Sequence, residues 1–197
     1  YYEGNFGEAR DYLTRSIQVH RESGFRRGVA MSTLDLGDVA HMEGDYDEAR
    51  RLYAEGLQIG RQSQIADAIG TALIRLGRLA HDAGDGFAAR RDLREGLAVA
   101  RDRRLNESAI QALEGFAAVA AAEGEAARGL RLAGAAAAAR RATHTPISPV
   151  EAPLLVRWLA PARAALSREE QDAAWEEGSR MPRDEAVAYA LEVTEAA

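Results

Sequence analysis

The sequence has no cysteine and no lysine among its 197 residues. The absence of cysteine excludes disulfides, thiolate zinc sites and thiol catalysis, and it agrees with a reducing compartment, so we expect a cytoplasmic protein. Without lysine there is no phosphate-binding loop of the GxxxxGK[ST] type. All 25 basic residues are arginine, against 31 acidic residues, and the formal charge of −6 argues against bulk attraction to nucleic acid or to an anionic membrane.

Other signals are also absent. No apolar run approaches the ~18 residues that a membrane helix needs, and the first residues lack the basic and apolar segments of a signal peptide. GxSxG and HExxH motifs do not occur, and no nucleophile–base pair stands out. We therefore predict a protein that is not an enzyme, has no cofactor or catalytic residue, and contacts neither nucleic acid nor membrane directly.

What the sequence does contain is an internal repeat. Glycine recurs every 40 residues, at Gly4, Gly44, Gly84 and Gly124. Other positions keep the same spacing, among them Ala9, Ala49 and Ala89; Leu13, Tyr53 and Leu93; and Leu36, Leu76 and Phe116. A fixed period of this size is typical of a solenoid, in which each repeat packs mainly against its neighbours.

Each repeat is predicted to be a pair of helices. Apolar residues at helical spacing are interrupted at Gly44-Asp45, where Asp45 can cap the following helix. The predicted repeat helices cover residues 6–22, 25–43, 46–62, 65–83, 87–101, 105–123 and 125–142. After a proline-containing linker, further helices are expected at 149–166, kinked or split by Pro161; at 167–177, stopped by Gly178; and at 183–195. The predicted domains are repeats over 1–142, beginning within a repeat, and a C-terminal helical cap over 143–197.

The unit around Gly44 resembles the tetratricopeptide repeat. The resemblance is carried by Leu36-Gly37, Ala40, the run Gly44–Ala49 and an aromatic residue at Tyr53. It implies an all-α, right-handed superhelical solenoid of antiparallel helix pairs. The period of 40 is also similar to the helical sensor region of MalT-like and LuxR-type ATPase transcription regulators of bacteria, and residues 132–140 and 173–178 resemble the end of that region. In that family, ATPase and DNA-binding domains flank the helical region, and neither is present here.

The tetratricopeptide resemblance also implies that the first helix of each repeat lines a concave groove. The residues placed there are Met31, Leu34, Asp38, His41, Thr71, Ile74, Arg78, His81, Asp82 and Glu114. Their mixture of apolar and charged side chains suits a peptide, protein or small-molecule effector. Two alternatives remain open: Asp38 and Arg78 simply neutralise each other on a solvated face without a ligand, or His41 and His81 approach a metal, for which adjacent repeats are expected to stand too far apart.

Two surface features have competing interpretations. Arg50-Arg51 and Arg90-Arg91 form a repeated ridge, but neighbouring carboxylates favour a charge-balanced outer face over a nucleic-acid stripe. The sequence begins without methionine and within a repeat, which predicts a fragment of a longer chain whose first helix has an uncovered apolar face. A homodimer through that face is one expectation.

Together these observations predict a non-catalytic helical-repeat module that binds a protein, peptide or ligand. The resemblance implies that this module is the sensor region of a bacterial transcription regulator. The alternative is a generic scaffold for protein assembly without a regulatory ligand.

Overall fold

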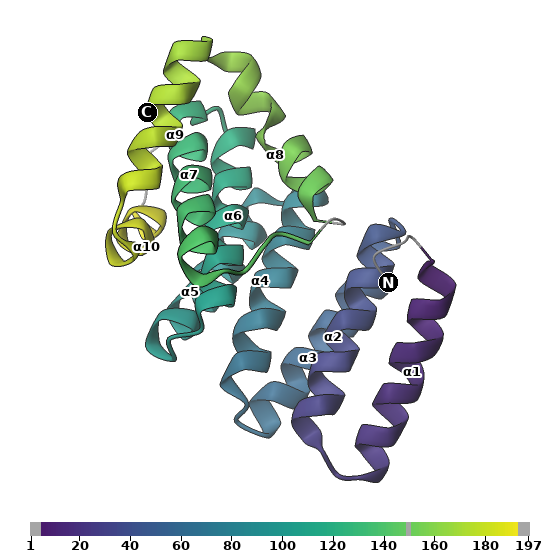
Figure 1. The fold of residues 1–197 in the computed structure, drawn as a ribbon. Helices are drawn as coiled ribbons and strands as arrows, with labels where there is room; N and C mark the ends of the chain where they lie inside the picture. Colours follow the sequence, from purple (N-terminus) through teal and green to yellow (C-terminus); the bar gives the residue numbers. More distant parts are fainter. Residues whose placement is uncertain (1–4, 149–150, 193–197) are drawn as a thin grey trace. The chain divides into compact units, whose positions relative to one another are not determined.

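A computed structural model describes residues 5–148 and 151–192, and in these ranges the chain folds into ten α-helices without a β-strand (Figure 1). The helices are α1 (Phe6–Glu22), α2 (Arg26–Met42), α3 (Tyr46–Gln62), α4 (Ala66–Asp82), α5 (Gly86–Asp102), α6 (Asn106–Ala122), α7 (Ala126–Thr143), α8 (Ala152–Ala165), α9 (Arg168–Arg180) and α10 (Arg183–Leu191). None of these helices is long and apolar enough to cross a membrane.

The first seven helices begin 20 residues apart, because each ends in the same turn. A residue with positive φ follows each helix, and the next backbone N–H donates to a carbonyl five residues back, as Asp45 does to Ala40 at 2.9 Å. This is the Schellman arrangement, which satisfies carbonyl groups at a helix end. Glycine occupies the positive-φ position at Gly24, Gly44, Gly84 and Gly124, whereas Gln64, Arg104 and His144 occupy it in the other turns.

Side-chain caps mark every second turn. The carboxylates of Asp45 and Asp85 accept from the backbone N–H three residues on, at 3.1 and 2.9 Å, and the Asn5 carbonyl oxygen does the same at 3.2 Å. Each cap satisfies one N–H group that the first turn of a helix leaves without a partner. The predicted starts of α1 and α3 are therefore confirmed.

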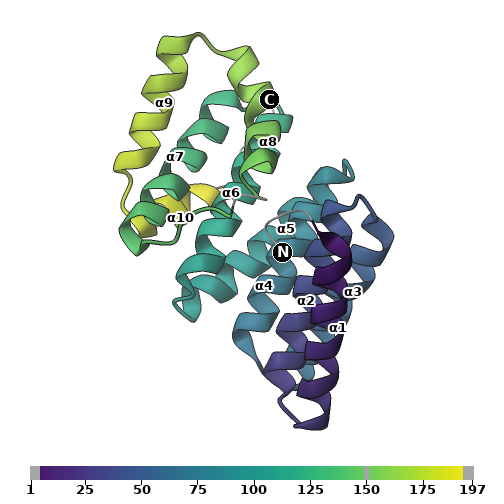
Figure 2. The same cartoon turned by 45° about the vertical axis from the view of Figure 1, so that its right-hand side comes forward.

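The chain divides into two compact units, Tyr1–Leu105 and Asn106–Ala197. In the first unit, consecutive helices pack against each other in pairs from α1 to α5, and α2 also touches α4 (Figures 1 and 2). Its core contains Leu34, Tyr53 and Leu79, which come from α2, α3 and α4. The predicted all-α fold of paired helices is confirmed, and it is that of a tetratricopeptide-like helical solenoid.

In the second unit, α6 packs against α7, and the last three helices cover this pair. Helix α8 contacts α6, α9 lies along α7, and α10 touches both (Figure 2). Trp158 of α8 is buried. The domain prediction placed its boundary by repeat pattern at residue 142, whereas the compact units meet after Leu105.

Two predictions for the C-terminal helices are wrong. Gly178 does not end a helix, because α9 continues to Arg180. It lies instead at a close crossing, where a Cβ atom on Gly178 would overlap the backbone of Arg131, and one on Gly134 would overlap the backbone of Trp175. Pro161 does not split its helix either, since α8 runs through it to Ala165. Residues 149–150 and 193–195 of the predicted helices lie outside the described residues.

Candidate interaction surface

The residues predicted to line a groove in the first unit come from α2 and α4, but several of them are buried. Leu34 and Ile74 have no exposed surface, and Thr71 and Arg78 are also buried. The reason lies on the neighbouring helices. Gly56 faces Leu34, and Gly96 faces Ile74, so closely that an added Cβ would lie 2.5 and 2.7 Å from those side chains. Leu34 and Ile74 therefore hold the repeats together and present no surface.

The remaining groove residues stay partly accessible. Met31, Asp38 and His41 lie on α2, and His81 and Asp82 lie on α4. We call the partly accessible side chains of these two helices the α2/α4 face; they are Met31, Asp35, Asp38, His41, Met42, Arg75, His81 and Asp82. Asp35, Arg75 and Met42 were not among the site residues predicted from the sequence.

An ion cluster lies at the centre of the α2/α4 face. Arg75 Nη2 lies 3.0 Å from Asp35 Oδ1 and 2.6 Å from Asp38 Oδ2, so one guanidinium nitrogen joins two carboxylates of α2. The Tyr53 hydroxyl of α3 donates to Asp38 Oδ1 at 2.8 Å. The cluster therefore connects three helices through charged or polar groups that are mostly buried.

Burial dominates the protonation of this cluster. Burial raises the pKa of Asp38 above its ordinary value, although the positive charge of Arg75 opposes the rise. Burial also raises the pKa of Tyr53 well above its ordinary value, and the Asp38 carboxylate adds to this. For Arg75, burial lowers the pKa, but Asp38 and Asp35 outweigh it and the net shift is upward. Arg75 is therefore a permanent cation.

Arg75 also carries a donor without an acceptor. Its Nη1 atom is the buried side-chain nitrogen that has no hydrogen-bond partner among the described residues. A guanidinium offers five N–H donors in a fixed plane, and a buried donor without an acceptor costs about 1–3 kcal/mol. Such a group stays in a native structure only where other interactions hold it, and here Asp35 and Asp38 do so.

His41 extends the polar contacts toward the C-terminal ends of α2 and α4. Its Nε2 atom lies 2.8 Å from Asp82 Oδ2, and both side chains are largely buried. The imidazole ring meets Tyr46 and Tyr53 of α3 edge-on, with ring centroids 5.5 and 6.5 Å apart. These contacts orient His41, so that the two predicted groove residues His41 and Asp82 do come together.

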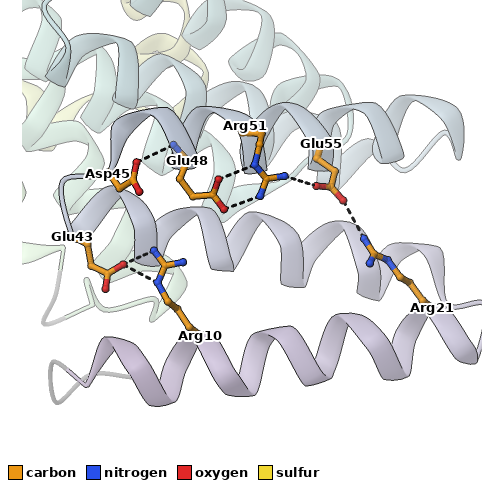
Figure 3. A network of polar contacts seen from close by, with 7 residues as sticks. All are labelled: Arg10, Arg21, Glu43, Asp45, Glu48, Arg51 and Glu55. Carbon is orange, nitrogen blue, oxygen red and sulfur yellow. Dashed lines mark hydrogen bonds and ion pairs between the residues drawn. The ribbon is translucent and has the colours of Figure 1, made fainter.

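The outer face of the first unit is charge-balanced, as the sequence predicted (Figure 3). Arg51 lies 2.7 Å from Glu48 and 3.4 Å from Glu55, and Glu55 also lies 3.1 Å from Arg21 of α1. Arg10 pairs with Glu43 at the other end of the same face. Exposed pairs of this kind contribute about 0–1 kcal/mol each. Their arginines are occupied by carboxylates of the same chain.

Glu114, the last predicted groove residue, belongs to the second unit and is buried. Arg140 of α7 donates to both of its carboxylate oxygens, from Nε at 2.6 Å and from Nη2 at 2.9 Å. Arg140 Nη1 also donates to the Thr145 carbonyl, 3.4 Å away. Two parallel hydrogen bonds are the strong, planar form of an arginine–carboxylate pair. In this structure Glu114 stabilises the α6–α7 contact and does not reach a surface.

Comparison with known proteins gives one family. A family model described as tetratricopeptide repeat matches residues 1–62, which include α1, α2 and α3. Comparisons with curated proteins and with solved structures found no match. The match and the paired helices together support a helical-repeat module for protein interaction. The first three helices thus resemble a tetratricopeptide repeat in sequence, and α4 and α5 continue the same fold in the first unit.

Proposed function

We propose that the chain is a non-catalytic interaction module that binds a peptide segment of a partner protein on the α2/α4 face. The observation that carries the proposal is the Asp35–Arg75–Asp38 cluster. Two carboxylates are fixed by one guanidinium, and the Asp35 side chain keeps 38% of its surface exposed. A fixed and half-exposed carboxylate is a ready acceptor for N–H groups or for a basic side chain of a bound segment.

Apolar contacts are available beside these acceptors. Met31 and Met42 are partly exposed on the same helix as Asp35 and Asp38. Methionine side chains adapt to differently shaped partners, which suits a peptide-binding surface. Because helix packing and ion pairs already hold the α2/α4 face, little ordering of this face is needed on binding. We therefore expect ligands that combine an apolar residue with a basic one.

The test is a selection of random displayed peptides against the full chain, followed by affinity measurement with the selected peptides. Asp35→Arg should weaken their binding at least about tenfold, since it replaces an acceptor by a like charge for a basic peptide. Asp11→Arg makes the same change on the exposed surface of α1 and serves as the matched control. Selected peptides that bind both variants as tightly as the original chain would exclude the α2/α4 face.

We further propose that the module is the sensor region of a bacterial transcription regulator. The resemblance of residues 132–140 and 173–178 to LuxR-type regulators supports this. A segment bound to α2 and α4 could favour one repeat-to-repeat angle over another and so act on attached domains. Sequencing the gene on both sides tests the proposal: ATPase and helix-turn-helix segments are expected, and their absence would favour the generic scaffold.

A further inference from the structure

Helix α1 presents two large apolar side chains to the outside. Tyr12 is 73% exposed and Val19 is 59% exposed. They stand seven residues apart and therefore lie on one side of the helix, with Ser16 between them. The opposite side of α1 is occupied, because Leu13 and Ile17 are buried in the contact with α2. Helix α1 thus has two apolar sides, of which α2 covers one.

The same positions in the later repeats are covered. Leu52 and Ile59 of α3 correspond to Tyr12 and Val19, and they are 3% and 8% exposed. The helix that covers them is α2, since a Cβ atom on Gly37 would lie 3.3 Å from Leu52. Gly56, between them, faces Leu34 of α2. On α3 this side is therefore packed by the helix that comes directly before it in the chain.

Helix α5 repeats the arrangement with α4. Val99 corresponds to Val19, and a Cβ atom on Gly70 of α4 would lie 3.3 Å from it. Gly96 corresponds to Ser16 and faces Ile74 of α4. The preceding helix thus packs in the same register in both repeats where it can be seen, which shows what kind of element fits the exposed side of α1.

We propose that the side of α1 formed by Tyr12, Ser16 and Val19 is a docking site for an amphipathic helix connected to α1 through the Gly4-Asn5 turn. The turn is supported by Asn5, whose side chain caps α1 as Asp45 and Asp85 cap the helices that follow α2 and α4. The docking helix packs on α1 as α2 packs on α3. This interface is separate from the α2/α4 face and does not depend on the function proposed for it.

Ser16 gives the site a preference. The corresponding residues, Gly56 and Gly96, leave room for Leu34 and Ile74, whereas Ser16 has a side chain of its own. Ser16 Oγ lies 3.1 Å from Ser32 Oγ, which holds it in place. The docking helix must therefore carry a small residue where α2 has Leu34, because a leucine there would overlap Ser16.

The experiment supplies such a helix to the full chain. A copy of residues 26–42, with Leu34→Ala in the copy, is fused directly before Glu3, which reproduces the spacing between α2 and α3. We expect the melting temperature to rise by about 5 °C, because Tyr12 and Val19 become buried. The same fusion with leucine retained in the copy should give a smaller rise.

The control is the double variant Tyr12→Ser/Val19→Ser. In the unfused chain it should leave the melting temperature unchanged, since both side chains are exposed, but in the fused chain it should remove the rise. No rise on fusion, or a rise that survives the double variant, overturns the proposal. Sedimentation of the unfused chain gives a further outcome. A dimer that Val19→Asp dissociates would overturn the proposal in favour of a second copy as the occupant.

Discussion

At the scale of single residues, the buried Glu114–Arg140 pair makes the clearest prediction. Arg140→Met leaves a buried carboxylate without its partner, which should lower the free energy of unfolding by about 3–5 kcal/mol. Glu114→Leu/Arg140→Met removes both charges and should recover most of that loss. Urea denaturation of the two single variants and the double variant checks this as a thermodynamic cycle. Simple addition of the two single effects would contradict a direct interaction between these side chains.

The residues of the α2/α4 face show where sequence reasoning stops. The repeat pattern placed Asp38, His41 and Asp82 on the correct helices, but it also assigned Leu34 and Ile74 to the surface. Their burial depends on Gly56 and Gly96 opposite them, a tertiary relation that helical spacing does not contain. Asp35 and Arg75 are 40 residues apart, at matching positions of two repeats. Opposite charges at one repeat distance were therefore a usable signal for the ion cluster.

At the scale of elements, the turns predict a difference between glycine and other residues. Gln64 and Arg104 have φ of 54° and 56°, where a Cβ atom costs roughly 1–2 kcal/mol. Gln64→Gly should therefore raise the free energy of unfolding by about 1 kcal/mol, and Gly44→Gln should lower it by a similar amount. Urea denaturation measures both. Ser63→Gly is the matched control, since Ser63 has φ of −101°, and a gain there equal to that of Gln64→Gly would contradict the explanation.

Helix positions followed from the sequence far better than helix contacts did. Each repeat helix begins beside a capping residue or a glycine turn, which are local signals, so that α1 and α3 have their predicted bounds. Gly178 was misread because a glycine at a helix end and a glycine at a helix crossing are the same letter. Only the approach of α9 to the Arg131 backbone distinguishes the two.

At the scale of the whole molecule, the two compact units predict two unfolding transitions. Both tryptophans, Trp158 and Trp175, lie in the second unit, so their fluorescence reports on that unit, whereas circular dichroism reports on helices of both. Gly178→Ala places a methyl group against the Arg131 backbone and should destabilise the second unit by about 1–3 kcal/mol or more. In urea, the fluorescence midpoint should fall, while a later part of the dichroism change stays at its original midpoint. Glu176→Ala, an exposed change on the same helix, should move neither midpoint appreciably. Fluorescence and dichroism that shift together in Gly178→Ala would show instead that the units unfold as one, with each interface shared along the whole array.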